Sequence, residues 1–367
     1  MKAVVLIGGK GTRLRPITHT VPKAMVPLRN RPYFCYMLDS LKAAGLDGAV
    51  LSMGYLPEAI RDYFGGGEEP REFSLQYVVE DRPLGTAGGI KNVEPHLDGG
   101  PFVATNGDIL TGLDLSELVE AHQESDALAT ITLTSVENPT AYGLVEVDSE
   151  MQVRRFLEKP AYDEVTTSLV NAGIYVLEPE VLNLIPEGRE VSLEREVFPR
   201  LQSMGKLRAH VSSAYWRDIG TPRSYLAASH DVLSGAIGRN GDFRYTSLHE
   251  SVRISKNVTL LPPLHVARDC EIGAGATIGG RTSLGERCFV GEGAVVEGSI
   301  LFEDARVEDG AVVRNAIVGP GAVISNECIV RGTSVLGAGC VIEEGNVLDQ
   351  GARIAPGARV PRGTINF

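Results

Sequence analysis

The sequence predicts an α/β domain with a doubly wound, mostly parallel sheet, followed by a solenoid of six-residue repeats. Three observations support this fold class. Apolar runs of strand length alternate with helix-length amphipathic segments over about the first 230 residues. Aliphatic side chains then recur every six residues between Ile254 and Val360. A glycine-rich, basic stretch directly follows the first apolar run, at the strand end where such sheets bind ligands.

The composition is typical of a globular protein of two domains, with 367 residues, 43% hydrophobic and 22% charged. The formal net charge of −12 argues against nonspecific binding to nucleic acid or anionic membranes. No apolar run approaches the roughly 20 residues of a membrane span, and the first one is too short for a signal peptide. Five cysteines without a C-x-x-C pair argue against disulfides and zinc. We therefore expect a reduced, cytoplasmic protein with no nucleic-acid or membrane partner.

The elements of the first domain, residues 1–234, follow one another in a regular order. Strands are predicted at 2–7, 49–53, 75–79, 102–105, 129–135, 144–147, 153–157, 172–177 and 207–211. Helices are predicted at 33–44, 57–64, 90–93 and 192–204, and from about residue 222 onward. Loops that could carry function follow three of the strands, at 8–13, 84–89 and 106–108. Because ligands of parallel sheets bind at the carboxyl ends of strands, these loops are expected to form the site.

A linker is predicted over residues 235–250, because Gly235–Asp242 holds two glycines and an Asn-Gly pair. In the second domain, residues 251–367, the repeated aliphatics can be buried only by stacking the repeats. This run resembles the hexapeptide repeats of left-handed parallel β-helices, with three hexads per coil and about six coils. The spacing shortens by one residue at 302–307 and 313–318, which predicts tighter corners there. Four cysteines occupy the small position two residues before an aliphatic and should be buried packing residues: Cys270, Cys288, Cys328 and Cys340.

The stretch after the first strand has the composition of a polyphosphate-binding loop. The glycines of Gly8–Thr12 let backbone N–H groups approach an anion closely, and Arg13, Arg15 and Lys23 supply cations. Prolines within the segment indicate a stiff loop. The spacing matches neither the P-loop nor the G-x-G-x-x-G dinucleotide fingerprint, because Leu14 stands where the latter needs glycine.

The stretch Gly8–Lys23 resembles the signature of sugar-1-phosphate nucleotidyltransferases, G-x-G-T-R-L-x-P-x-T-x-x-x-P-K, with only Ile17 departing mildly from the usual leucine. The resemblance implies the Rossmann-like nucleotidyltransferase fold and attack of a sugar-1-phosphate on the α-phosphate of a nucleoside triphosphate, releasing pyrophosphate. A phosphate monoester is largely dianionic at pH 7, so the reaction needs no general base. It needs alignment of two anions and neutralisation of charge, which glycine amides, fixed cations and Mg²⁺ can supply.

The resemblance assigns the phosphate and metal contacts residue by residue. The nucleotide would be held by Leu6, Gly8, Gly9, Gly11, Thr12 and Arg13. Arg13 would also stabilise the leaving pyrophosphate, while Lys23 would contact the α-phosphate or the incoming phosphate. Asp108, in N-G-D, and Asp218, in W-R-D-I-G, would hold the Mg²⁺ cofactor.

Further motifs are expected to bind the sugar. Lys159, in E-K-P, would grip the sugar phosphate as the third catalytic cation, and Glu158 would bind a sugar hydroxyl. Asn171, in N-A-G, would hydrogen-bond the sugar, with the backbone of Gly143 nearby.

The base is expected to lie against Leu84, Gly85 and Thr86, in a segment that resembles the L-G-T-A-G of GDP-mannose pyrophosphorylases. Glu80 ends the preceding strand, and a carboxylate can accept from guanine N1–H and N2–H₂, whereas uracil and thymine offer one N–H donor. These features favour GTP and mannose-1-phosphate.

Several alternatives stay open at this stage. The same chemistry could use UTP or dTTP with glucose-1-phosphate, and Glu80 could be a solvated residue at a strand end. The chain could also be a non-catalytic regulatory homologue, or the repeats could carry an acyltransferase histidine, His249 or His265. Because the open ends of a β-helix expose strand edges and apolar side chains, we expect a homo-oligomer.

Overall fold

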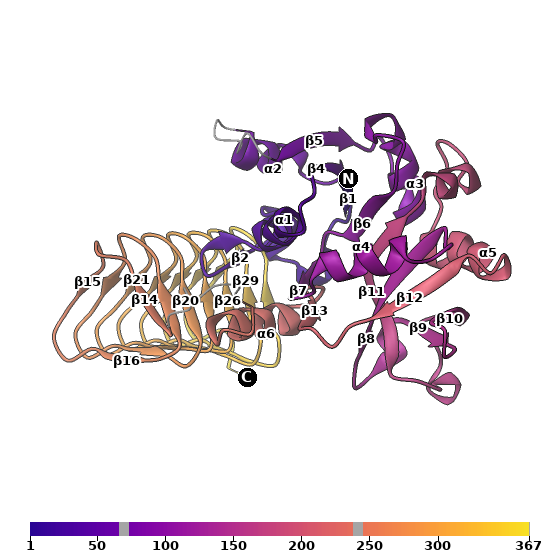
Figure 1. Cartoon of the computed structure of the whole chain (residues 1–367). Coiled ribbons are helices and arrows are strands. Elements are labelled where there is room, and N and C mark those ends of the chain that lie inside the picture. Colours follow the sequence, from indigo (N-terminus) through magenta and orange to yellow (C-terminus); the bar gives the residue numbers. More distant parts are fainter. Residues whose placement is uncertain (66–72, 238–244, 367) are drawn as a thin grey trace. The chain divides into compact units, whose positions relative to one another are not determined.

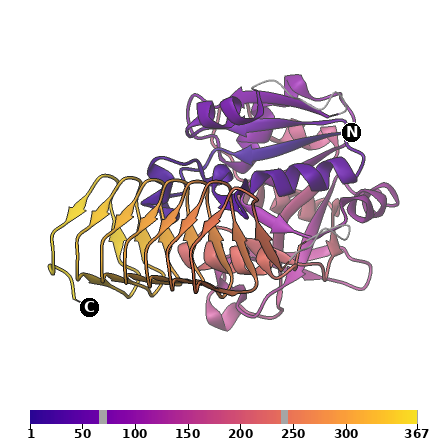
Figure 2. The ribbon, with the colours of Figure 1, turned by 90° about the vertical axis from the view of Figure 1, so that its left-hand side faces the viewer.

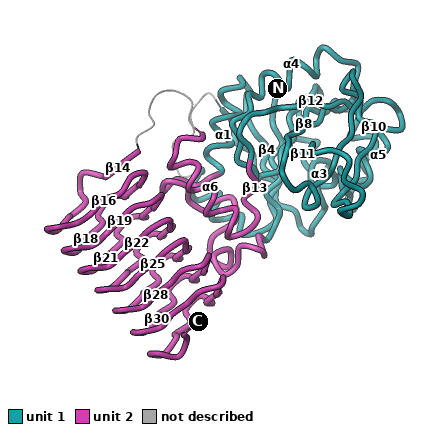
Figure 3. Tube along the Cα trace, turned by 90° about the horizontal axis from the view of Figure 1, so that it is seen from below, with its two compact units in different colours: residues 1–10, 34–216 teal, residues 11–33, 217–367 magenta. Residues whose placement is uncertain are grey.

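In a computed structural model, the chain is described over residues 1–65, 73–237 and 245–366. It divides into two compact units, residues 1–10 with 34–216 and residues 11–33 with 217–367 (Figure 3). Part of the predicted 235–250 linker, residues 238–244, lies outside the described residues. Its last part forms strand β14 (Thr246–Leu248) of the second unit. Within the described residues, no helix combines the length and hydrophobicity needed to cross a membrane.

The first unit is built on one mixed nine-stranded sheet (Figure 1). Its strands are β1 (Lys2–Ile7), β4 (Gly48–Met53), β5 (Ser74–Val79), β6 (Phe102–Asn106), β8 (Ala129–Ser135), β9 (Gly143–Val147), β10 (Val153–Glu158), β11 (Leu169–Leu177) and β12 (Leu207–Val211). Strand β1 lies between β4 and β6 and is parallel to both, and β5 extends the parallel part beyond β4. Strand β11 runs antiparallel to β6, β8 and β9. The predicted α/β fold with its parallel core is therefore confirmed.

The helices and short elements of the first unit connect these strands. The helices are α1 (Phe34–Ala43), α2 (Pro57–Phe64), α3 (Gly85–Asn92), α4 (Leu115–Gln123) and α5 (Phe198–Ser203). The short elements are β7 (Ile109–Thr111), β13 (Trp216–Asp218, whose first residue ends this unit), η4 (Glu94–His96), η5 (Pro139–Ala141), η6 (Tyr162–Glu164), η7 (Pro179–Leu184) and η8 (Leu193–Val197). The core is apolar and continuous from β1 and β4 to β8 and β11.

One predicted loop is wrong: residues 85–89 are the first turns of helix α3. Glycines disfavour helices in isolation, but here they permit close approach. A Cβ on Gly88 would lie 2.6 Å from the carbonyl oxygen of Arg189. The Ala87 and Gly88 N–H groups donate to the Val191 carbonyl at 2.9 and 3.2 Å, which fixes the helix start. Packing against residues 189–191 therefore outweighs the local propensity.

The predicted helix at 192–204 exists, but it begins with the π-helical turn η8 before α5. Ser192 caps this turn, because its hydroxyl accepts from the Arg195 N–H at 3.2 Å. Pro199 has no N–H to offer to the preceding turn, so it cannot make the bond that a regular α-helix needs there.

In the second unit, three parallel sheets wind into a β-helix, consistent with the left-handed form that the repeats predict (Figure 2). The first sheet holds β14, β17 (Leu264–Val266), β20 (Thr282–Leu284), β23 (Ile300–Leu301), β26 (Ile317–Val318), β29 (Val335–Leu336) and β32 (Arg353–Ile354). The second holds β15 (Arg253–Ile254), β18 (Glu271–Ile272), β21 (Phe289–Val290), β24 (Arg306–Val307), β27 (Val323–Ile324), β30 (Val341–Ile342) and β33 (Arg359–Val360). The third holds β16 (Thr259–Leu261), β19 (Thr277–Gly279), β22 (Val295–Glu297), β25 (Val312–Arg314), β28 (Ile329–Val330) and β31 (Val347–Leu348).

The strand register confirms the predicted shortening of the repeat. Ile272 pairs with Val290, 18 residues on, whereas Val290 pairs with Val307 and Val307 with Ile324, each only 17 residues on. The four repeat cysteines are free thiols with at most 1% exposure, as predicted for packing residues. Each coil therefore contributes small and aliphatic side chains to one continuous core.

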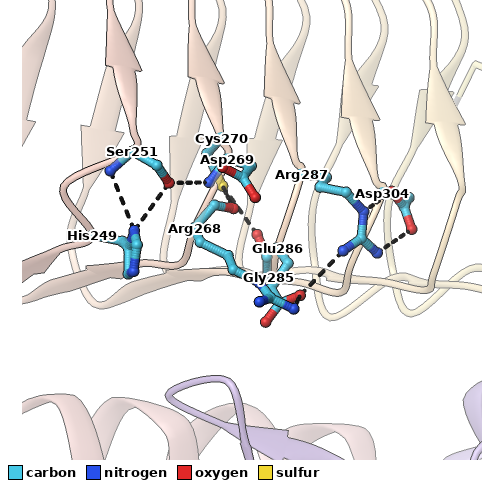
Figure 4. Close-up of polar contacts among 9 residues, drawn as sticks. All are labelled: His249, Ser251, Arg268, Asp269, Cys270, Gly285, Glu286, Arg287 and Asp304. Atoms are coloured by element: carbon cyan, nitrogen blue, oxygen red, sulfur yellow. Dashed lines mark hydrogen bonds and ion pairs between the residues drawn. The ribbon is translucent and has the colours of Figure 1, made fainter.

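Charged side chains connect neighbouring coils on the surface of the β-helix (Figure 4). The Arg287 guanidinium donates to Asp304 from two nitrogens at 2.7 Å and contacts Glu286 at 3.1 Å, and Glu286 also pairs with Arg268 at 2.8 Å. Exposed pairs of this kind contribute little each. Nearby, the Ser251 hydroxyl accepts from the Asp269 N–H at 2.8 Å and lies 2.9 Å from Nδ1 of His249. His249 therefore takes part in a surface turn.

Residues 11–33 and helix α6 (Pro222–Leu233) belong to the same unit as the coils. Residues 11–33 form the turns η1 (Thr12–Leu14), η2 (Ile17–His19) and η3 (Lys23–Met25) and the hairpin β2 (Pro27–Leu28) with β3 (Arg31–Pro32). The Tyr225 hydroxyl donates to the Pro27 carbonyl at 2.6 Å, and His230 Nε2 lies 2.9 Å from the Gly298 carbonyl. Helix α6 thus contacts both the hairpin and the coils.

His265, on β17, should make the stability of the fold depend on pH. Burial, aided by the Arg29 charge, lowers the pKa of His265 to about 4 from 6.5. Between pH 6.5 and pH 4, His265 is protonated in the unfolded chain but stays neutral in the folded chain. The free energy of unfolding should therefore fall as the pH drops from about 6.5 to about 4. The loss is at most about 3 kcal/mol. Urea unfolding at pH 7 and pH 5 should show a smaller loss for His265→Asn than for the wild type, and equal losses would contradict this assignment.

Candidate active site

The first unit places seven predicted nucleotide residues around the carboxyl end of β1. Leu6 lies near the end of this strand, and its carbonyl accepts from the Gly107 N–H at 2.9 Å. A Cβ on Gly8 would lie 3.5 Å from both carboxylate oxygens of Glu80, and one on Gly89 would lie 3.2 Å from Leu6 Cδ2. Glu80 also accepts a hydrogen bond from the Leu84 N–H at the start of α3, which Gly85 and Thr86 continue. In the described part of the chain, no atom lies within 4 Å of a Cβ placed on Gly9, which therefore borders open space.

Glu80 is held in place by hydrogen bonds. Its Oε1 accepts from the Ser52 hydroxyl at 2.8 Å, and its Oε2 accepts from the Leu84 N–H at 3.2 Å. The alternative of a freely solvated strand-end carboxylate is therefore wrong. A carboxylate has about four acceptor positions, so each oxygen keeps one for a ligand. Such a fixed acceptor pair suits two N–H donors on one edge of a base.

The start of α3 depends on a glycine and on a shared hydroxyl. Gly85 has a φ of +70°, and a Cβ there would lie 2.6 Å from the Val191 carbonyl. The Thr86 hydroxyl donates to Glu194 Oε2 and accepts from the Leu193 N–H, both at 2.8 Å. Most of its hydrogen-bonding capacity is thus used within the protein, so its backbone and methyl group are the parts left for a nucleotide.

The predicted sugar residues gather on β9, β10 and β11. Gly143 pairs with Glu158 in the sheet, and a Cβ on Gly143 would lie 3.1 Å from Glu158 Oε2. Lys159 has a φ of +52° and donates its N–H to the Tyr142 carbonyl at 3.0 Å, and its exposed ammonium lies 3.9 Å from Glu158. Asn171 Oδ1 accepts from the Gly173 N–H at 2.9 Å, which fixes the amide. The structure therefore brings Gly143, Glu158 and Lys159 together.

Glu194 is a site residue that the sequence reasoning missed. It receives hydrogen bonds from Thr86, from Ser192 at 2.7 Å and from the buried Tyr175 hydroxyl at 3.4 Å. Tyr175 in turn accepts from Asn171 Nδ2 at 2.9 Å. This chain of bonds joins the predicted base segment to the predicted sugar residues. The sequence held no signal for this role, because the role comes from bonds to residues on other elements.

Two carboxylates lie close together in this region. Burial and the nearby Glu194 charge raise the pKa of Glu158, while Lys159 opposes the shift. Burial and Glu194 also raise the pKa of the Tyr175 hydroxyl, which therefore stays protonated and available as a donor. Hydroxyl groups of a sugar could donate to the Glu158 and Glu194 oxygens and relieve this repulsion.

The second unit holds the basic part of the glycine-rich stretch. Gly11 takes the left-handed conformation, and its carbonyl accepts from the Leu14 N–H at 2.9 Å and from the Thr18 hydroxyl at 2.8 Å. A Cβ on Gly11 would lie 3.0 Å from Thr18 Cγ2 and 3.2 Å from Lys23 Cβ. The turn η1 that follows carries Thr12 and Arg13. The signature residue Thr18 thus holds the Gly11 carbonyl, and Lys23 packs beside Gly11.

Arg13 and Asp218 both lie beside Gly220. A Cβ on residue 220 would lie 2.6 Å from Oδ2 of Asp218 and 2.7 Å from Nη2 of Arg13, so only glycine lets both side chains come this close to the backbone. Mg²⁺ prefers oxygen ligands and is usually held by one or two carboxylates plus substrate phosphates. Over residues 1–65, 73–237 and 245–366, no cluster of three or more His, Cys, Asp or Glu could hold a metal by itself. A carboxylate beside a guanidinium fits a Mg²⁺ that a triphosphate also ligates.

Asp108 belongs to the first unit, directly after β6. A Cβ on Gly107 would lie 2.8 Å from the Leu6 carbonyl, so glycine lets this turn close against the end of β1. Asp108 thereby lies at the end of β6, next to the end of β1 where Leu6 and Gly8 stand. The predicted position at a carboxyl strand end is confirmed for this residue.

The model of the nucleotidyl transferase family matches residues 2–235, well over half of the chain. The chain belongs to this family. A second model, the GMPPB C-terminal domain, matches residues 247–365. The chain is therefore a nucleotidyltransferase that transfers a nucleotidyl group in nucleotide-sugar synthesis, and the alternative of a non-catalytic homologue is set aside.

Two relatives of this nucleotidyltransferase are named for mannose-1-phosphate guanylyl transfer, and a solved structure has a similar fold. The mannose-1-phosphate guanylyltransferase of Mycobacterium tuberculosis is 40% identical over 281 residues, 74% of this chain and 77% of that protein. The mannose-1-phosphate guanyltransferase of Aspergillus oryzae is 35% identical over 274 residues, 74% of each chain. HddC from Yersinia pseudotuberculosis, solved as a complex with GMP-PN, is 28% identical with a TM-score of 0.54, covering 63% of this chain and 99% of that one.

Proposed function

We propose that this nucleotidyltransferase transfers GMP from GTP to mannose-1-phosphate, giving GDP-mannose and pyrophosphate. Two named mannose-1-phosphate guanylyltransferases match three quarters of the chain. The structural observation that carries the choice of base is Glu80, whose carboxylate is fixed by Ser52 and the Leu84 N–H next to Gly8. Guanine alone among the common bases offers two adjacent donors, N1–H and N2–H₂, to such an acceptor pair.

The side chains of this protein then have the following parts in the reaction. Gly8, Gly9, Gly11 and Thr12 bind the triphosphate with backbone N–H groups. Arg13 neutralises charge on the leaving pyrophosphate. Lys23 and Lys159 hold the reacting phosphates in line, which is the larger part of catalysis in phosphoryl transfer.

The sugar is oriented by residues of the first unit. Glu158 accepts hydrogen bonds from the sugar hydroxyls, and Asn171 donates to them or accepts from them, beside the backbone of Gly143. Glu194 holds Asn171 in place through Tyr175, which accepts from Asn171 and donates to Glu194. Lys159 stands next to Glu158 and faces solvent with most of its side chain, so it is free to move onto a phosphate.

Asp108 and Asp218 are the residues we propose as ligands of Mg²⁺. When bound, Mg²⁺ neutralises phosphate charge and orients the triphosphate. The close approach of Asp218 and Arg13 beside Gly220 supports this assignment, because a triphosphate bound by Arg13 would also reach a metal on Asp218. We also place the protein in the cytoplasm, where its five buried free cysteines would stay reduced.

A substrate panel tests the proposed function. Purified protein with Mg²⁺ is offered GTP, ATP, CTP, UTP or dTTP, each with mannose-1-phosphate or glucose-1-phosphate, and pyrophosphate release is measured. The proposal expects the highest kcat/KM for GTP with mannose-1-phosphate. A preference for UTP or dTTP with glucose-1-phosphate would refute it in favour of the open alternative.

Self-association through the β-helix is a further part of the proposal. The first coil exposes apolar side chains at the open end of the stack, with Leu248 at 38%, Ile254 at 44% and Leu261 at 43% exposure. Burying them would be favourable by about 25 cal/mol per Å². Light scattering after size exclusion should therefore show an oligomer at micromolar concentration, and Ile254→Asp should dissociate it. A clean wild-type monomer would contradict this expectation.

A further inference from the structure

An arginine of the β-helix hydrogen-bonds to the backbone of the phosphate-binding stretch. Arg353 is the first residue of β32, and both it and residues 11–15 belong to the second compact unit (Figure 3). Its Nη1 donates to the carbonyl oxygen of Arg13 at 3.1 Å and to that of Arg15 at 3.0 Å. A residue from the end of the repeats thus contacts the residue that is assigned to the leaving group.

The Arg13 and Arg15 carbonyls lie at the end of the short helical turn η1, where carbonyl groups lack a hydrogen-bond donor within the turn. Turn η1 is closed by hydrogen bonds from the Leu14 N–H to the Gly11 carbonyl and from the Arg15 N–H to the Thr12 carbonyl. The carbonyls of a final helical turn have no partner within the helix and attract cations. Arg353 satisfies two of them with one nitrogen. The turn is therefore fixed at its start by the left-handed Gly11 and at its end by Arg353.

The side chain of Arg13 extends from this anchored backbone to the site. Its Nη2 lies 2.7 Å from the place of a Cβ on Gly220, beside the Asp218 carboxylate. The anchored carbonyl and the guanidinium belong to the same residue, so a shift of the turn moves the charge that meets the pyrophosphate. A misplacement of about 1 Å can cost about a hundredfold in rate.

Arg353 differs from the residues directly before it in its own sheet. The residues in register with it in the three preceding coils, Val335, Ile317 and Ile300, are aliphatic, whereas the first coils have Ser283, His265 and Ser247 at this place. Arg359 has the same place in the next hexad, after an alanine and before an aliphatic, and it pairs with Glu343. Among the described residues, Arg353 forms no ion pair with a carboxylate, and its hydrogen bonds go to the Arg13 and Arg15 carbonyls.

We propose that Arg353 is a positioning residue for nucleotidyl transfer, which sets the place of Arg13 by holding the Arg13 and Arg15 carbonyls. The final coils of the β-helix then act on the reaction itself as well as on assembly. The proposal rests on the proposed function where it assigns Arg13 to the leaving pyrophosphate. The anchoring of the turn does not depend on that assignment.

Three variants of the full-length protein test the proposal: Arg353→Ala, Arg353→Lys and, as the matched control, Arg359→Ala. Hydrogen exchange of a peptide spanning residues 11–17 reports on the anchor without any substrate. Initial rates of pyrophosphate release give kcat and KM for both substrates, and thermal unfolding reports on overall stability.

In Arg353→Ala, exchange in this peptide should rise about tenfold and kcat should fall roughly 10- to 100-fold. The KM for the sugar phosphate should stay unchanged. Lysine can still donate to the carbonyls, so Arg353→Lys should recover part of both effects. Arg359→Ala should leave exchange and kcat at wild-type values with a similar change in unfolding temperature.

The remaining outcomes also decide the question. Wild-type exchange and kcat in Arg353→Ala would refute the anchor. Faster exchange with unchanged kcat would confirm the anchor and refute its role in positioning, and an equal loss of kcat in Arg359→Ala would refute the specific role. If the wild type released no pyrophosphate from any substrate pair, the proposed function would fail, while the exchange comparison would still confirm or refute the anchor.

Discussion

Asp218→Asn is expected to lower kcat at least about a thousandfold while the protein stays folded, and Asp108→Asn should do the same. Asparagine keeps the size of aspartate but has no charge, so it binds Mg²⁺ weakly and does not favour the metal-bound triphosphate. In Asp218→Asn the Arg13 guanidinium, which shares the space beside Gly220, stays in place. GTP should therefore still bind, and the loss should appear in kcat more than in KM.

The measurement is pyrophosphate release at saturating GTP and mannose-1-phosphate over a range of Mg²⁺ concentrations. Asp126→Asn serves as control, because Asp126 is an exposed carboxylate paired with Lys206. The control should match the wild type, and thermal unfolding should be similar for all three variants. Near-wild-type kcat in Asp108→Asn or Asp218→Asn at millimolar Mg²⁺ would remove that residue from the proposed metal site.

Periodicity made most of the fold predictable. Strands such as β8 and β12 and helix α2 have the predicted bounds, because their apolar runs end sharply at polar or breaker residues. The spacing of the aliphatics also predicted the coils in which paired residues lie 17 positions apart in place of 18. The first turns of α3 were not predictable, because their helical state depends on hydrogen bonds to Val191, about a hundred residues further along the chain. Local propensity contains no information about that partner.

The candidate site divides in the same way. Motif residues such as Gly143 and Glu158 could be named from the sequence, and the structure places them in one strand pair. Glu194 could not be given a role, because its importance comes from bonds to Thr86 and Tyr175 on two other elements. The bonds of Arg353 to residues 13 and 15 span about 340 positions and follow no repeat. Roles that arise from tertiary contacts have no signature in a single sequence.

Glu80→Gln is expected to lower kcat/KM for GTP by about a hundredfold and to change the value for UTP far less. Glutamine replaces one acceptor oxygen with an NH₂ group, which would face the N–H donors of guanine. The preference for GTP should therefore collapse even though the side chain has the same size. Kinetics with both triphosphates at fixed mannose-1-phosphate give the ratio directly.

A structural loss alone would produce a different pattern. Glu80 also accepts from Ser52 and from the Leu84 N–H, so Glu80→Gln disturbs these bonds too. Ser52→Ala removes one of them and leaves the carboxylate able to accept from a base, so it should lower the values for GTP and UTP by similar, small factors. If Glu80→Gln lowered both values equally, as Ser52→Ala should, Glu80 would support the loop without reading the base. Only a selective loss for GTP assigns base recognition to this carboxylate, because only guanine presents two donors to it.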